Sequence, residues 1–188
     1  MIIRNDDIAF DTNVEELKWF CDLCDKYGFK ILQAITPLGT CEKIHVKMSD
    51  DEIVALGGKH TIIDNRDLME YLWHRHDIIG VHGLWHTHSP SMEDIMLSKK
   101  ILESIDLKPT YFVTPFNEGI YPPEVCGLIT SQKTQRLEDY LKNDKIPTDQ
   151  IIYCHSWRFG SWYPKESLEK CLKRISSTIP KSNEDIQK

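Results

Sequence analysis

Residues 77–114 read DIIGVHGLWHTHSPSMEDIMLSKKILESIDLKPTYFVT. An apolar run, Asp77–His82, is followed by a helical pattern that extends to Ser104 and then by a second apolar run, Pro109–Thr114. Ser91 is a good N-cap for the helix, and acidic residues occupy its first turn, where the helix dipole favours them. A strand, a helix and a second strand in this order predict a parallel βαβ unit with a right-handed crossover.

The same alternation continues through the chain. The predicted strands are residues 1–3, 30–35, 77–82, 109–114, 125–130 and 150–155, and the predicted helices are residues 13–28, 64–74, 91–104, 136–142 and 165–175. The strands are apolar throughout, which is typical of a sheet that is covered on both faces. We therefore predict an α/β fold, either a closed or nearly closed barrel or a doubly wound open sheet. Residues 40–60 are polar and are assigned to no element.

Length and composition limit the classes of protein to consider. The chain has 188 residues, of which 40% are hydrophobic, and its formal net charge is −6. This size suits a single domain, residues 1–178, followed by a polar tail, residues 179–188. The acidic balance argues against binding to duplex nucleic acid, and no apolar run is long enough for a membrane span. The first 20 residues lack the apolar region of a signal peptide, so we expect a cytoplasmic protein.

The six cysteines include a C-x-x-C pair, Cys21 and Cys24. Such a pair can bind zinc or carry out redox chemistry, and no second pair at zinc-finger spacing follows it. Together with Val14 and Leu17, the two cysteines lie on one apolar stripe of the predicted first helix. We therefore interpret both as small buried hydrophobic residues.

Ionisable residues collect where predicted strands end. Asp6 and Asp7 follow the first strand, His82 closes the strand of residues 77–82 with His86 just after it, and His155 closes the last strand. In folds with parallel strands the functional residues lie at this edge of the sheet. The sequence therefore places these five side chains near one another.

His82 and His86 are four residues apart, so both imidazoles can reach one ion. A carboxylate from the Asp pair would complete a three-ligand metal site with an open position for water. The second carboxylate could then accept the proton of that water. The alternatives are a solvated turn for the Asp pair and hydrogen-bonded interior residues for the histidines. His88 could also replace His86 as a ligand.

These motifs resemble those of the NodB-type polysaccharide deacetylases, carbohydrate esterase family four. The family's Asp-Asp motif is matched by Asn5-Asp6-Asp7 and its His-x-x-x-His motif by His82-Gly83-Leu84-Trp85-His86. Its aromatic third motif is matched by residues 112–117, and its C-terminal apolar strand ending in His by residues 151–155. The resemblance implies a distorted or incomplete (β/α) barrel of about seven parallel strands.

The resemblance also implies a role for each site residue. Asp7, His82 and His86 would hold a divalent metal, zinc or another. Asp6 would be the general base for the water on this metal, and His155 would be the general acid that protonates the leaving amine. A backbone N–H near Phe116 would help the metal to stabilise the oxyanion.

Substrate contacts are expected from residues beside this centre. Aromatic side chains can pack against sugar rings, and arginine can bind a carboxylate or a phosphate. The candidates are Trp85, Pro115, Phe116, Asn117, Trp157 and Arg158. Packing of the barrel mouth is the alternative interpretation of the aromatic residues.

The sequence departs from the family pattern at several points, beginning with Arg4-Asn5 in place of the usual Thr-Phe before the Asp pair and a long gap between Asp7 and His82. The third motif lacks the usual Arg, since Thr114 stands near that position. No Asp-rich motif is visible that would supply the carboxylate for tuning His155. The expected function is metal-dependent removal of an acyl group, such as acetyl, from an N-acylated sugar or sugar conjugate. The alternatives are an amidase for a non-sugar C–N bond and a catalytically silent carbohydrate-binding barrel.

Overall fold

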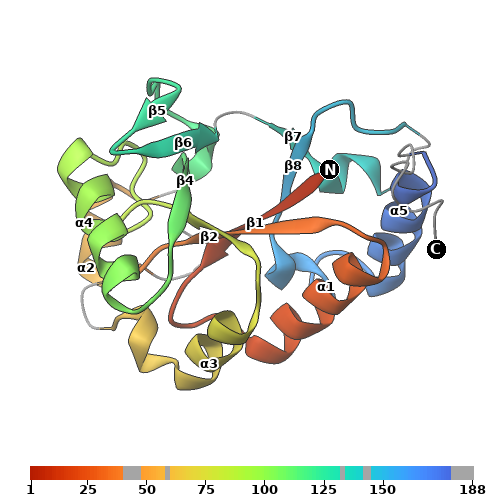
Figure 1. Cartoon of the computed structure of the whole chain (residues 1–188), viewed down its shortest axis with the longest axis horizontal. Helices are drawn as coiled ribbons and strands as arrows, with labels where there is room; N and C mark the ends of the chain where they lie inside the picture. Colours follow the sequence, from red (N-terminus) through yellow and green to blue (C-terminus); the bar gives the residue numbers. More distant parts are fainter. Residues whose placement is uncertain (40–47, 58–59, 132–133, 142–144, 179–188) are drawn as a thin grey trace.

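The centre of the structure, a computed structural model, is a curled sheet in which β1 lies between β2 and β8 (Figure 1). The structure describes residues 1–39, 48–57, 60–131, 134–141 and 145–178. Across the sheet the strand order is β5-β6-β4-β3-β2-β1-β8-β7. Every neighbouring pair is parallel except β5 and β6, which are antiparallel.

The element bounds are as follows. The strands are β1 Ile2–Ile8, β2 Lys30–Ile35, β3 Ile78–Val81, β4 Pro109–Val113, β5 Glu124–Val125, β6 Leu128–Ser131, β7 Gln135–Arg136 and β8 Ile151–Cys154. The helices are α1 Val14–Lys26, α2 Asp50–Gly57, α3 Arg66–His74, α4 Met92–Ser104 and α5 Lys165–Ser176. The described segments also contain the 3₁₀ turns η2 Ile62–Asp64, η3 Pro115–Asn117, η4 Leu137–Tyr140 and η5 Ser156–Arg158.

Helices cover the convex side of the sheet (Figure 1). Alternate strand residues such as Ile3, Ile31 and Phe112 face this side and join one continuous apolar core with the buried faces of the helices. A much smaller cluster, Leu32, Ala34 and Val113, lies apart from this core. The fold is therefore the incomplete (β/α) barrel that the sequence predicts, with one antiparallel strand at its edge.

Local sequence signals fix the helix starts. The Asn13 side chain caps α1 by accepting a hydrogen bond from the N–H of Glu16, at 3.1 Å. Ser91 and Asp94 form a reciprocal capping box at the start of α4. Each cap satisfies N–H groups that have no partner inside the helix, so both helices begin where the sequence predicts.

Three expectations differ from the structure. The first strand does not end at Ile3 but continues through the Asp pair to Ile8. The predicted strand 125–130 is a hairpin, because Cys126 and Gly127 both adopt positive φ and turn the chain between β5 and β6. The predicted helix 136–142 is instead the end of β7 and the single turn η4.

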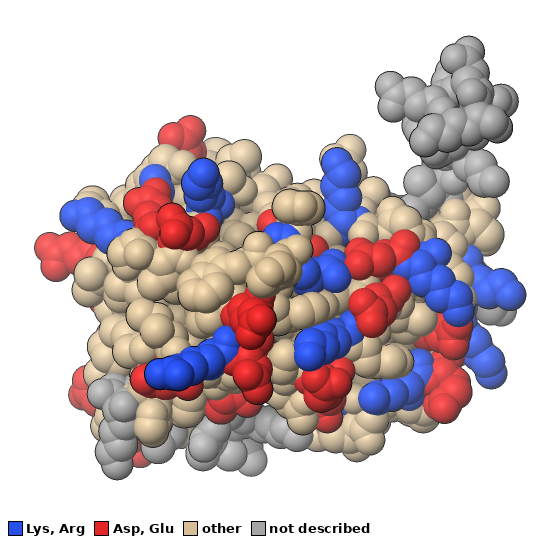
Figure 2. Space-filling view, turned by 60° about the horizontal axis from the view of Figure 1, so that its bottom comes forward, with Lys and Arg blue, Asp and Glu red and all other residues tan. Residues whose placement is uncertain are grey.

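Some predictions lie outside the described residues: Cys41, most of the first half of residues 40–60, and the tail 179–188. The second half of residues 40–60 contains α2. In the described segments no helix has the length and apolar character that crossing a membrane requires. Basic and acidic side chains alternate over the face shown in Figure 2.

The cysteine pair lies on the buried side of α1. Cys21 and Cys24 are both fully buried in the main apolar core, as the packing interpretation predicts. Burial raises the pKa of the Cys21 thiol to about 12 and also raises the pKa of Cys24. Neither thiol is therefore poised for redox chemistry or metal binding.

This burial predicts the reactivity of the thiols. At pH 8 a thiol whose pKa is raised stays protonated, so Cys21, Cys24 and Cys154 should not react with dithiobis(nitrobenzoate) in the native protein. All three should react once guanidinium unfolds the chain, as measured by mass spectrometry of the labelled peptides. Rapid labelling of Cys21 and Cys24 in the native protein would contradict the packing interpretation.

Candidate metal and catalytic centre

The Asp pair owes its geometry to a bulge in β1. The pairing of β1 with β2 is regular from Ile2 to Asn5 and shifts register before Ile8. Asp7 has a φ of 66°, in the left-handed region. Consecutive side chains of a regular strand point to opposite faces, but a bulge can re-aim one of them. Asp6 and Asp7 can thus act at the same centre.

Asp7 meets two imidazoles that come from the end of β3. Its Oδ1 lies 3.3 Å from Nε2 of His82 and 3.0 Å from Nε2 of His86, and the two Nε2 atoms are 3.2 Å apart. His82 directly follows β3, and His86 is brought back by a positive φ of 61°. In the described part of the chain this is the one group of three or more His, Cys, Asp or Glu residues close enough to hold a metal ion.

This donor set fits a divalent metal. Ligand atoms that bind zinc at about 2.0–2.1 Å lie roughly 3.0–3.4 Å from one another, which agrees with the three distances. Nδ1 of His82 lies 3.0 Å from the carbonyl oxygen of Val113 and must donate to it. The lone pair of His82 is therefore on Nε2, which faces the other two ligand atoms.

The charges within the triad are strongly coupled. Burial alone would raise the pKa of Asp7, but the imidazoles of His155, His86 and His82 outweigh it and hold the pKa well below its usual range. Burial lowers the pKa of His86 more than the Asp7 charge raises it. An ionised carboxylate beside a neutral imidazole is the protonation state that metal binding needs.

Asp6 is held by Arg4 of the same strand. Nε and Nη2 of Arg4 donate to the two carboxylate oxygens of Asp6 at 2.8 and 2.7 Å. Both residues are buried, and the guanidinium also donates to Ser131 Oγ at 3.1 Å and to Asn117 Oδ1 at 2.7 Å. A bidentate pair of this kind fixes the plane of the carboxylate. The arginine that binds Asp6 thus comes from β1 itself and not from the third motif.

His155 lies between two carboxylates. Its Nε2 is 3.3 Å from Oδ2 of Asp7, and its Nδ1 is 3.6 Å from Oε1 of Glu138. Burial lowers the pKa of His155, but the negative charges of Asp7 and Glu138 outweigh it and the pKa is raised. Glu138 belongs to η4 and its side chain is only 1% exposed. Glu138 is therefore a buried carboxylate beside His155 that the sequence does not reveal.

The third motif forms a strained turn over the centre. Phe116 and Asn117 have φ values of 54° and 56°. The Phe116 ring lies between two imidazoles, with centroids 4.5 Å from His86 and 4.1 Å from His88. His88 thus packs on this ring, and its Nδ1 lies 3.2 Å from Glu118, outside the metal triad.

The other predicted substrate residues have different surroundings. Trp157 donates its indole N–H to Oδ2 of Asp7 at 3.3 Å and so borders the triad. Arg158 lies over the Trp157 ring, with its Nη1 3.6 Å from Oε1 of Glu138, so it contacts the carboxylate behind His155. Pro115 is buried and Trp85 half-buried. Their roles toward a substrate stay predictions.

Backbone strain is concentrated here. Of the six non-glycine residues with positive φ in the described segments, four are Asp7, His86, Phe116 and Asn117. Such conformations cost free energy and persist where the surroundings enforce them, often at functional sites. Independently of any motif, the strained backbone positions therefore gather at the same centre as the metal triad.

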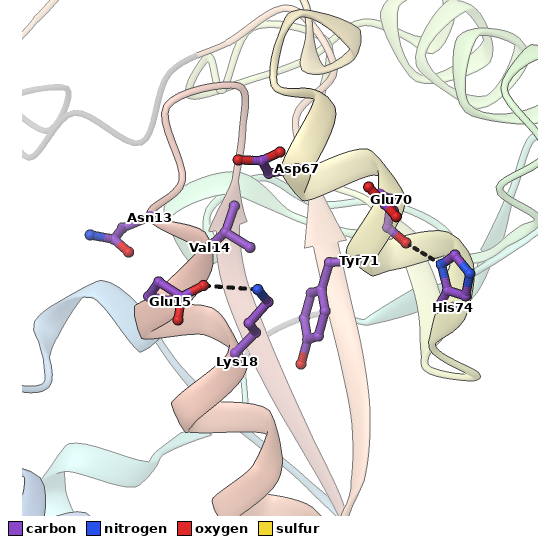
Figure 3. A pocket seen from close by; sticks show the side chains of 8 residues that line it. All are labelled: Asn13, Val14, Glu15, Lys18, Asp67, Glu70, Tyr71 and His74. Atoms are coloured by element: carbon purple, nitrogen blue, oxygen red, sulfur yellow. Dashed lines mark hydrogen bonds and ion pairs between the residues drawn. The ribbon is translucent and has the colours of Figure 1, made fainter.

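A separate pocket between α1 and α3 lacks these features (Figure 3). It has a volume of about 660 Å³ and is lined by Asn13, Val14, Glu15, Lys18, Asp67, Glu70, Tyr71 and His74. Glu15 pairs with Lys18 at 2.8 Å, and the His74 ring bonds to the carbonyl of Glu70 in its own helix. These polar groups bind one another, so the pocket offers no converging set of ligand atoms.

Comparison with known proteins supports the fold assignment. No protein-family model and no curated protein matches the chain. Among solved structures, a family 4 acetyl xylan esterase from Clostridium thermocellum in complex with a cobalt ion is similar, with a TM-score of 0.52 at 13% sequence identity. The match covers 95% of this chain and 83% of the esterase. The chain therefore shares the overall fold of this esterase.

The triad predicts metal binding that depends on each ligand. The wild-type protein should bind one Zn²⁺ or Co²⁺ per chain. Asp7→Ala and His82→Ala should each weaken binding at least about 100-fold, since outer-sphere partners alone account for ~10–100-fold. Competition with a chromophoric chelator and the Co²⁺ absorption spectrum measure this. His88→Ala is the matched control and should bind the metal like the wild type. Weaker metal binding by this variant would mean that His88 is a ligand and that the triad is assigned wrongly.

The Arg4–Asp6 pair predicts a coupled stability effect. Arg4→Met leaves a buried carboxylate without its partner and should lower the free energy of unfolding by about 3–5 kcal/mol. Adding Asp6→Asn should recover part of this loss, because the unpaired charge is then gone. Urea denaturation measures both. Lys18→Met removes an exposed ion pair and should change stability little. If Arg4→Met lowers the free energy of unfolding equally in the wild type and in the Asp6→Asn variant, the two residues are not coupled.

Proposed function

We propose that this protein is a metal-dependent hydrolase that removes an acyl group, acetyl above all, from the amine of an N-acylated sugar or sugar conjugate. The observation that carries the proposal is that two adjacent carboxylates have different partners. Asp7 faces His82 and His86, whereas Asp6 is held beside them by Arg4. A site that only bound a metal or a sugar would not need the second carboxylate.

The metal would be held by Asp7, His82 and His86, where it would act as a Lewis acid toward water and the acyl carbonyl. Asp6 is the proposed general base. Arg4 fixes its carboxylate in one orientation and compensates its charge during burial, so the group can accept the proton of an attacking water.

His155 is the proposed general acid for the leaving amine. Its Nε2 is directed at the centre, toward Oδ2 of Asp7, and its Nδ1 is directed at Glu138. A carboxylate near Nδ1 stabilises the protonated form of the ring. An amine leaves far more readily when it is protonated, so this residue matters more for an amide than for an ester.

The substrate would lie against the aromatic side chains that border the triad. Phe116 packs on His86, and the Trp157 indole contacts Asp7, so both rings are within reach of an acyl sugar bound at the centre. Aromatic faces suit the C–H faces of a sugar ring. Support for a carbohydrate also comes from the acetyl xylan esterase of similar fold.

The decisive variant is Asp6→Asn. It should keep its metal, because Asp6 is not a ligand, but should release acetate from N-acetyl sugars at least roughly 100-fold more slowly than the wild type. Asp7→Asn is the matched control and should lose metal and activity together. Acetate release from a panel of N-acetyl sugars, O-acetyl sugars and small non-sugar amides measures turnover.

The panel also separates the alternatives. Hydrolysis of small amides alone would replace the sugar proposal by a general amidase. Hydrolysis of O-acetyl sugars alone would make the protein an esterase. A metal-loaded wild type that hydrolyses nothing, or an unimpaired Asp6→Asn variant, would overturn the mechanism.

A further inference from the structure

A chain of buried hydrogen bonds crosses the sheet behind the candidate centre. Asn5 of β1 and Gln33 of β2 are fully buried, although their neighbours in this layer are apolar. Asn5 Nδ2 donates to Gln33 Oε1 at 3.0 Å, and Gln33 Nε2 donates to Asp77 Oδ2 at 2.8 Å. At the other end Asn5 Oδ1 accepts the backbone N–H of Ser156 at 2.8 Å. We call these four groups the amide relay.

The amide relay has one direction. The backbone N–H of Ser156 can only donate, and the ionised carboxylate of Asp77 can only accept, so both amides between them must present oxygen toward Ser156 and nitrogen toward Asp77. The remaining N–H of Gln33 faces Sγ of Cys21 at 3.3 Å. Bonds aligned in one direction polarise one another and strengthen the chain.

At the acidic end of the relay, Asp77 directly precedes β3 and is held by an ion pair. Arg75 donates to the two oxygens of Asp77 from Nε at 2.7 Å and from Nη2 at 2.9 Å. Arg75 is itself paired with Asp25 of α1. Asp77 therefore cannot turn away from Gln33 without giving up a bidentate ion pair.

The other end fixes the peptide that joins His155 to Ser156. Its N–H binds Asn5 Oδ1, and its carbonyl oxygen accepts the N–H of Arg158 at 3.1 Å. A peptide plane held on both sides sets the backbone direction at His155, from which the imidazole reaches between Asp7 and Glu138. We propose that Asn5 and Gln33 are positioning residues for His155; the catalytic part of this inference rests on the proposed function.

Core packing alone does not explain these residues. Two buried amides cost free energy unless every polar atom is satisfied, and apolar side chains would fill the same layer without that cost. Asn5 alone would satisfy the N–H of Ser156. Gln33 adds the link that holds the amide of Asn5 in one orientation, which is a requirement of positioning.

The test is Gln33→Met, which keeps the length of the side chain and removes its amide. We expect kcat to fall about 10-fold with KM and metal affinity unchanged, because a misplaced acid slows the reaction without weakening binding. Exchange of the Ser156 amide hydrogen should accelerate about 10-fold, and the NMR signals of the His155 imidazole should shift. Cys24→Ala removes a buried atom from the same layer outside the relay and should change none of these.

A rescue experiment uses the direction of the relay. Asn5→Asp keeps an acceptor for the N–H of Ser156 but places a carboxylate against the amide oxygen of Gln33. The Gln33 amide must then turn to donate to this carboxylate, and its oxygen comes to face the carboxylate of Asp77. Adding Asp77→Asn supplies a donor for the Gln33 oxygen, so the bonds run from residue 77 through Gln33 to residue 5, where they meet the bond from the Ser156 N–H. The substitution costs one of the two Arg75 bonds at residue 77, so the double variant should recover part of the kcat and of the His155 signals that Asn5→Asp loses.

The outcomes are distinct. If Gln33→Met and Cys24→Ala have the same kcat and the same His155 signals, or if Asp77→Asn rescues nothing, the relay is core packing and the inference is wrong. If the wild type hydrolyses no acyl compound, the proposed function fails. The amide exchange and the His155 signals still decide whether the relay positions this residue.

Discussion

The left-handed backbone at Asp7 is the constraint on which the centre depends. A regular strand would direct Asp6 and Asp7 to opposite faces, one into the helix layer and one into the barrel. The bulge brings both carboxylates to one centre at a cost of about 1–2 kcal/mol for the unfavourable φ. Such a conformation persists only when neighbours enforce it, and here three imidazoles surround the Asp7 carboxylate.

Four consecutive residues of β1 make three separate sets of contacts. Arg4 and Asp6 form a buried ion pair, Asn5 lies on the helix-covered side and binds the peptide after His155, and Asp7 meets the histidines. The central position of β1 makes this possible, because it borders β2 on one side and β8 on the other. The bulge in β1 therefore lies where Asp7 meets the histidines that follow β3 and β8.

Local sequence signals made the helix starts and the parallel strands predictable. Ser91 and Asn13 mark helix starts by local hydrogen bonding, and apolar runs mark the parallel strands. Arg4 lies two residues from Asp6, so strand periodicity could have paired them. Glu138 gave no such signal, because its burial depends on η4 packing beside β8, and from sequence alone this segment was predicted to be a helix. Non-local burial of a charged residue cannot be deduced from its own neighbours.

Two adjacent aspartates with the same chemistry acquire different properties through their partners. Arg4 engages both oxygens of Asp6, so the charge of this carboxylate is compensated within the strand. Asp7 has no guanidinium, and its two oxygens face imidazoles on opposite sides, His86 at Oδ1 and His155 at Oδ2. Exchanging these surroundings would exchange the roles of the two residues. In the proposed mechanism, the assignment of base and ligand therefore follows from where β1 places its arginine, not from the Asp-Asp motif alone.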